Sequence, residues 1–258
     1  MKGRMKYKIT CRYIGHATTL ITINGTCVLT DPHFSRRTLF FKRQGELAFD
    51  PAALPEISCV LISHTHFDHL NIPSFKYISQ KVPVIVPEGC DKSISKFVSN
   101  PIIELAQFAT HELPDGTKIT AVPVKHRGGR FSYLRFTKSS GYLIQKGDRT
   151  VYFTGDASYS DHFAEVGASS RIDLALLPIS GYSPRFFMHG RHMTPSQVVQ
   201  AFEDLKARYM VPIHWGSFSL SLEPTNQPIE LLNKILEDRP DLKDRIPIVQ
   251  HGEEITFE

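Results

Sequence analysis

The sequence predicts a mixed α/β protein whose β-sheets contain both antiparallel and parallel strands. Its first third holds apolar, β-branched runs that are typical of strands, at residues 8–14, 19–23 and 26–30. Asn24-Gly25 is a hairpin turn signal between the last two runs. Farther along, a strand-like run at 59–63, a helix-like stretch at 72–78 and a strand-like run at 83–87 follow one another. We therefore expect an antiparallel meander that continues into a partly parallel sheet.

The rest of the chain alternates strand-like runs with helix signals. We expect strands at 102–105, 116–124, 141–144, 150–154, 174–179, 209–213 and 246–257, and helices at 93–98, after 194 and at 229–236. The helix after 194 is marked by Thr194 as its cap, Pro195 in its first turn and Gln197 to complete a capping box. With no internal repeat or linker, the 258 residues are expected to form one domain, 1–258.

The composition allows a full hydrophobic core, since 41% of the residues are hydrophobic and 22% are charged. No apolar run of about 18 residues is present, and no secretory apolar core follows the basic start of the chain, so we expect a soluble, cytoplasmic protein. The net charge of +4 suits anionic substrates, but Lys and Arg are not dense enough to predict nucleic-acid binding. The scattered cysteines are interpreted as reduced core residues: Cys11, Cys27, Cys59 and Cys90.

The densest group of metal-ligand side chains, His64-Thr-His66-Phe-Asp68-His69, comes directly after the apolar run 59–63. If that run is a strand, His64 and His66 point to one side, and the chain turns before Asp68 and His69. One short stretch can therefore serve two metal ions. Imidazole and carboxylate suit zinc, iron or manganese, and the absence of cysteine argues against a closed structural zinc site. The alternative, a histidine-rich surface loop, is disfavoured by this spacing behind a strand.

Three more strand-like runs end at candidate ligands, which are His126, Asp156 and His214. Loops at the carboxyl ends of strands converge, so these side chains are expected near the histidine motif. Gly155 would let the backbone turn sharply before Asp156. The alternative for Asp156 is an ordinary turn aspartate.

These residues together resemble the metallo-β-lactamase superfamily. The resemblance narrows to the branch that contains N-acyl-phosphatidylethanolamine-hydrolysing phospholipase D, in matching order from about residue 13 to residue 217. It is carried by IGHAT at 14–18, LTDP at 29–32, GDASY at 155–159, PISGYSPRFFM at 178–188, HMTP at 192–195 and IHWG at 213–216. The stretch GYSPRFFM is far more selective than the metal motif alone.

The resemblance implies a four-layered αββα sandwich of two mixed β-sheets with a two-metal centre between them. It implies one ion on His64, His66 and His126, a second on Asp68, His69 and His214, and Asp156 as the bridge. The expected metal is zinc, with iron and manganese as alternatives. A hydroxide held between the ions would attack a phosphodiester, which makes Asp68 and Asp156 part of the catalytic machinery.

Further site residues also follow from the resemblance. His192 is expected beside the substrate phosphate as a catalytic hydrogen-bond donor, with Tyr182 and Arg185 as other substrate contacts. A surface salt bridge is an equal alternative for Arg185. His16 and Asp31 could hydrogen-bond a metal-ligating histidine from behind, and a strand-end turn is the alternative for Asp31.

Two loops and one histidine lie outside the expected ligand set. The basic, aromatic stretch 35–50, with Phe40 and Phe41, could touch lipid, or the two rings could anchor the loop in the core. Residues 127–130, Arg-Gly-Gly-Arg, are expected to form a flexible basic loop beside the site. His251, which precedes a glycine, is interpreted as a turn residue rather than a further ligand.

Three functions remain open at this stage. The first is a phospholipase D-type phosphodiesterase that releases N-acylethanolamine from N-acyl-phosphatidylethanolamine-like lipids, with peripheral membrane contact. The second is a hydrolase of a small soluble phosphodiester, ester or lactone, because a fold does not determine a substrate. The third is a non-catalytic metal-binding member, which a missing ligand would have favoured. A homo-oligomer is compatible with all three.

Overall fold

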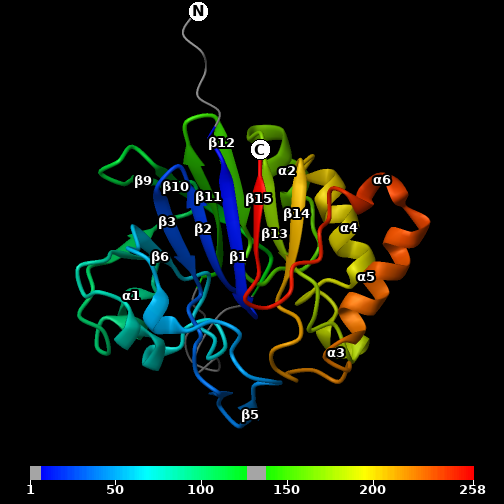
Figure 1. The fold of residues 1–258 in the computed structure, drawn as a ribbon, viewed down its shortest axis with the longest axis horizontal. Helices are drawn as coiled ribbons and strands as arrows, with labels where there is room; N and C mark the ends of the chain where they lie inside the picture. The colour runs from blue at the N-terminus through cyan, green and yellow to red at the C-terminus, as the bar shows by residue number, and fades with distance from the viewer. Residues whose placement is uncertain (1–6, 127–137) are drawn as a thin grey trace, which may run out of the picture.

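Two β-sheets face each other in the computed structural model, which describes residues 7–126 and 138–258 (Figure 1). The first sheet has the strand order β15-β1-β2-β3-β6-β7-β8. Its strands are β1 (Ile9–Gly15), β2 (Thr18–Ile23), β3 (Thr26–Thr30), β6 (Cys59–Leu61), β7 (Val84–Pro87), β8 (Ile102–Leu105) and β15 (Glu254–Phe257). The predicted meander is confirmed, since β1, β2 and β3 pair antiparallel, and so is its parallel continuation through β6, β7 and β8.

The second sheet has the order β14-β13-β12-β11-β10-β9. Its strands are β9 (Thr110–Glu112), β10 (Lys118–Pro123), β11 (Ser140–Lys146), β12 (Arg149–Phe153), β13 (Leu174–Pro178) and β14 (Tyr209–Ile213). Strands β9 to β12 pair antiparallel, whereas β12, β13 and β14 are parallel. Both sheets are therefore mixed, as predicted. A short hairpin of β4 (Arg37–Thr38) and β5 (Phe41–Lys42) lies apart from them.

Strand alternation divides the apolar side chains between two cores. Ile21 of the first sheet and Ile144 of the second belong to the core that lies between the sheets. Leu20, adjacent to Ile21 in β2, instead belongs to a second core on the outer face of the first sheet, together with Phe75 and Ile94. All four cysteines are free and buried, as predicted for core residues.

Helices cover the outer faces and complete the four layers. They are α1 (Asp91–Ile94), α2 (His162–Ser169), α3 (Arg185–Met188), α4 (Pro195–Asp204), α5 (Gln227–Asp238) and α6 (Pro240–Lys243), with 3₁₀ helices η1 (Pro51–Ala53) and η2 (Ile72–Tyr77). The capping box at Thr194 and Gln197 is confirmed at the start of α4. None of the helices in the described ranges combines the length and apolar character needed to cross a bilayer.

Several predicted elements differ in extent from the observed ones. The stretch at 72–78 forms a 3₁₀ helix, and the helix predicted at 93–98 is the short α1, which ends at Ile94. The closing strand begins at Glu254 rather than at 246. Strand β9 and helix α2 have no counterpart in the prediction, because three and eight residues are too few to carry a clear hydrophobic periodicity.

Candidate metal centre

The predicted ligands lie where strands of both sheets end. His16 is in the turn between β1 and β2, and Asp31 comes directly after β3. The histidine motif follows β6, and the remaining candidates follow β10, β12 and β14, at His126, Asp156 and His214. Residues that are far apart in the sequence thus meet at one end of the sandwich, as strand-end loops were expected to do.

The backbone is unusual at several of these positions. His16, Asp31 and His214 have positive φ angles of 58°, 33° and 64°. Gly155 has a φ of 61°, and a side chain at this position would overlap Ser63. Positive φ costs free energy for a residue with a side chain, and such residues concentrate at functional sites. The sharp turn predicted before Asp156 therefore depends on glycine.

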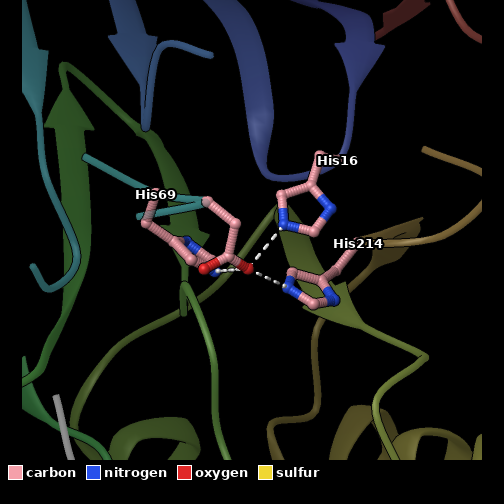
Figure 2. Close-up of side chains that lie close together, drawn as sticks. His16, His69 and His214 are labelled. Carbon is pink, nitrogen blue, oxygen red and sulfur yellow. Dashed lines mark hydrogen bonds and ion pairs between the residues drawn. The ribbon is translucent and has the colours of Figure 1, made fainter. Parts of the chain in front are cut away.

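Within the described residues, the side chains form two groups whose ligand atoms all lie within 4.8 Å of one another, so each group could hold a metal ion. One group is His64, His66, His126 and Asp156; the other is His16, Asp68, His69 and His214. In the second group, Oδ2 of Asp68 lies 2.9 Å from Nε2 of His16 and 3.5 Å from Nε2 of both His69 and His214 (Figure 2). His16 therefore contacts a carboxylate, rather than a ligating histidine from behind as we expected.

Asp156 lies between the two groups. Its Oδ2 atom is 3.8 Å from Nε2 of both His64 and His126, and 3.3 Å from Nε2 of His69. Its Oδ1 atom is 3.1 Å from Nε2 of His214. One buried carboxylate thus faces imidazoles of both groups, which is the position that a bridging ligand requires.

The donor set fits metal ions because buried ligand atoms lack hydrogen-bond partners. In the described part of the chain these include Nε2 of His69, Nε2 of His214 and Oδ1 of Asp156. A buried polar atom without a partner costs about 1–3 kcal/mol, so several at one point need an explanation. Cations between these atoms would satisfy them, and imidazole with carboxylate is a suitable donor set for zinc, iron or manganese.

The opposite ring nitrogens are held by partners that orient the imidazoles. Nδ1 of His69 lies 2.6 Å from Asp31, and Nδ1 of His64 lies 3.0 Å from the hydroxyl of Ser63. Nδ1 of His214 lies 3.1 Å from the hydroxyl of Ser180, and Nδ1 of His126 lies 3.1 Å from the carbonyl oxygen of Arg191. Each ring thereby directs Nε2 toward the centre. In metal sites the second ring nitrogen of a ligating histidine commonly has such a partner, which fixes the orientation of the ring.

Burial and neighbouring charges set the protonation states at the centre. Burial raises the pKa of Asp156, but the imidazoles of His214 and His69 outweigh burial and hold it well below its usual value. Burial lowers the pKa of His69, yet Asp156, Asp68 and Asp31 together raise it well above its usual value. The pKa of His64 is lowered well below its usual value by burial and then by His69. Ionised carboxylates and a neutral His64 are the protonation states that metal binding needs, whereas His69 would have to release its proton when a cation binds.

Of the predicted substrate contacts, His192 reaches the centre. Its Nδ1 atom is buried without a hydrogen-bond partner, 4.0 Å from Oδ2 of Asp156. The hydroxyl of Tyr182 instead donates to Gln227 at 3.2 Å. The guanidinium of Arg185 donates to Gln197 at 3.2 Å and is exposed. The contacts of Tyr182 and Arg185 therefore connect them to α5 and α4 rather than to the metal-ligating groups.

Sequence reasoning missed one buried carboxylate near the centre. Glu223 accepts hydrogen bonds from the backbone N–H groups of Gly181, Tyr182 and Ser183 at 2.5, 3.2 and 3.0 Å. It thereby holds the loop that leads to His192, and a Cβ at Gly181 would lie 2.8 Å from Nδ1 of that histidine. A lone glutamate after a run that alternates serine with Phe and Leu was the only signal.

His251 lies in a turn before β15, as predicted, and is in neither group of ligands. His251 contacts the carbonyl oxygen of Trp215 through Nε2 at 3.0 Å and packs edge-on against Tyr13, so it has a structural partner outside the two groups. The predicted basic loop at 127–130 lies outside the described residues.

Comparison with known proteins identifies the sequence family. Residues 26–215 match the beta-lactamase superfamily domain. The chain is 32% identical to N-acyl-phosphatidylethanolamine-hydrolyzing phospholipase D 1 of Caenorhabditis elegans, over 90% of this chain and 71% of that protein. It is 31% identical to the mitochondrial N-acyl-phosphatidylethanolamine-hydrolyzing phospholipase D of Saccharomyces cerevisiae, over 95% of this chain and 55% of that protein.

The fold has counterparts among solved structures. Igni18, a metallo hydrolase from the archaeon Ignicoccus hospitalis, superposes with a TM-score of 0.73 at 20% identity. The superposition covers 97% of this chain and 99% of Igni18. At that identity the likeness shows a common fold.

Proposed function

Because the chain belongs to the metallo-β-lactamase superfamily and is a metal-dependent hydrolase of that superfamily, we propose that it is a phosphodiesterase of phospholipase D type. Its substrate class is N-acyl-phosphatidylethanolamine-like lipids, from which it releases N-acylethanolamine. The names of the nematode and yeast relatives support this class. The observation that carries the proposal is the position of Asp156 between two groups of imidazole ligands.

The centre would hold two divalent cations, zinc rather than iron or manganese. His64, His66 and His126 would bind one, Asp68, His69 and His214 would bind the other, and Asp156 would bind both. His16 is an additional candidate for the second ion, because its Nε2 atom faces Asp68. Bound ions would lower the pKa of a coordinated water and neutralise the charge of a phosphodiester.

The chain's own residues supply orientation and one hydrogen-bond donor. Asp31, Ser63 and Ser180 hold Nδ1 atoms of the imidazoles, so that Nε2 of each ring stays directed at the centre. His192 has no hydrogen-bond partner at Nδ1, and its ring centroid lies 5.3 Å from that of His126 and 5.9 Å from that of His214. With a proton on Nδ1, this ring would donate a hydrogen bond to an oxygen of the substrate phosphate.

A substrate panel on protein of measured metal content tests the proposal. It compares a micellar N-acyl phosphatidylethanolamine, its short-chain glycerophospho analogue, a soluble chromogenic phosphodiester and a lactone. Asp156→Asn is the control for contaminating activity. We expect fastest turnover of the lipid and release of N-acylethanolamine. Fastest turnover of the lactone, or equal rates on the lipid and its short-chain glycerophospho analogue, would favour a hydrolase of small soluble substrates. No turnover of any of them would favour a non-catalytic metal-binding protein.

A further inference from the structure

Large apolar side chains are exposed on one end of the molecule. Nine such side chains are exposed in the described ranges, and six of them come from three segments, 37–42, 183–191 and 217–222. We call these six the apolar tip: Leu39, Phe40, Phe41, Phe186, Phe187 and Leu222. Phe40 and Phe186 are 89% and 91% exposed, so the alternative in which Phe40 anchors its loop in the core is wrong.

Backbone contacts join the three segments to one another. Gln44 donates its backbone N–H to Ser217 at 2.7 Å, and Arg43 forms a β-bridge with Phe218, which joins the first segment to the third. Leu222 donates to Ser183 at 3.2 Å, which joins the third to the second. Figure 1 shows β5 and α3 both at the end of the molecule opposite to the C-terminus. Soluble proteins seldom expose contiguous apolar patches without a binding role.

Cationic side chains accompany the apolar tip. Arg37 and Lys42 are exposed beside Phe40, and Arg191 places its guanidinium 4.4 Å from the ring centroid of Phe187. The nearby Arg36 is paired with Glu46 at 2.8 Å and is not counted among them. Residues 35–45 and 183–193 contain no Asp or Glu. The third segment is followed by Glu223, which is buried and occupied by three backbone N–H groups. Apolar side chains surrounded by cations are the composition that binds an anionic lipid surface.

The same segments line the metal centre. Phe218, between the hairpin and Leu222, has its ring centroid 5.3 Å from that of His16. The carbonyl oxygen of Arg191 accepts the hydrogen bond from His126, and His192 follows it directly. A bilayer in contact with the apolar tip would therefore lie next to the residues that would bind the headgroup.

We propose that the apolar tip docks this protein on the surface of an anionic phospholipid bilayer, with Phe40 and Phe186 inserted among the lipids and Arg37, Lys42 and Arg191 near the phosphates. This rests on the proposed lipid substrate, since docking delivers the substrate to the centre from the membrane. The apolar part of the contact comes from the two exposed rings, and the electrostatic part weakens with added salt.

Sedimentation with vesicles tests this docking without any need for catalysis. The probes are vesicles of phosphatidylcholine alone and of phosphatidylcholine mixed with phosphatidylglycerol. We expect binding to the mixed vesicles, weaker binding at high salt, and a loss of about tenfold or more for the double variant Phe40→Ser, Phe186→Ser. The matched control is Phe108→Ser, because Phe108 is 71% exposed and lies near β9, away from the apolar tip. For charge, Arg37→Gln should weaken binding, whereas Lys234→Gln on the exposed face of α5 should not.

Absence of vesicle binding by the unaltered protein would overturn the proposal. Unchanged vesicle binding by the double variant would also overturn the proposal. The apolar tip would then be a candidate surface for binding a protein partner. Turnover of the soluble chromogenic phosphodiester by Phe40→Ser separates docking from chemistry, because we expect this rate to be unchanged. If the double variant no longer binds vesicles but still turns over detergent-dispersed lipid at the full rate, the result supports the apolar tip as the docking surface. Docking without lipid turnover would contradict the proposed function alone.

Discussion

The Nδ1 atom of His69 lies 2.6 Å from the Oδ2 atom of Asp31, and neither side chain is accessible to solvent. Asp31 also accepts hydrogen bonds from the backbone N–H and the hydroxyl of Ser63, at 2.7 and 2.6 Å. This one carboxylate therefore orients the last ligand of the histidine motif and attaches the start of the motif to β3.

Replacement Asp31→Asn should weaken metal binding. It removes the charge that keeps His69 basic and oriented, and losses of partners behind metal ligands typically reduce metal affinity by roughly 10- to 100-fold. Competition with a chelator measures that affinity. Asp50→Asn serves as a control, since Asp50 only caps the 3₁₀ helix η1 at the surface. Equal metal affinity in Asp31→Asn and the unaltered protein would contradict the role given to Asp31.

Replacement Asp156→Asn should abolish most turnover while the fold survives. The amide has nearly the same volume but lacks the charge that faces both groups of imidazoles, so turnover per folded molecule should fall by several orders of magnitude. Turnover, metal content and circular dichroism on the same preparation measure the outcome.

The control for Asp156 is His251→Ala, which should retain its rate because His251 contacts Trp215 and Tyr13 outside the two groups. If Asp156 were only a turn residue, its variant would lose some stability but keep its metals and its rate.

Replacement Glu223→Gln should loosen the loop that leads to His192. Both carboxylate oxygens of Glu223 accept hydrogen bonds from backbone N–H groups, whereas glutamine has an NH₂ group in place of one oxygen. At least one backbone N–H would lose its acceptor, which costs about 1–3 kcal/mol of stability. We expect a lower melting temperature and slower turnover, with metal content unchanged. Glu230→Gln, at an exposed position in α5, provides the comparison. Unaltered melting and turnover would show that Glu223 does not position the loop.

Much of the site was predictable because its ligands follow strands with strong apolar patterns. The run before His64 and the run before His214 became β6 and β14, so their histidines were placed at the correct end of each sheet. Asp31 was predicted to support a metal-ligating histidine, and it contacts His69. Ser180 was missed because a serine hydroxyl contacts a ring through tertiary structure that no local pattern encodes.

The helical layers were less predictable. The stretch 72–78 has enough apolar residues for a helix, but the element has only six residues before the short connection to β7, and it forms a 3₁₀ helix. Glu223 was missed for a similar reason to Ser180, since its partners are backbone groups 40 to 42 residues away. These contacts join loops that follow the neighbouring strands β13 and β14, so they depend on the pairing of those strands rather than on any local pattern.

Metal titration of the stripped protein tests the central claim most directly. Zinc is added in known equivalents to chelator-treated protein while bound metal and phosphodiester turnover are followed together. We expect saturation near two ions per chain, with full turnover only when both are bound, because Asp156 faces both groups of ligands. Full turnover by a protein that elemental analysis shows to contain no transition metal would contradict the account.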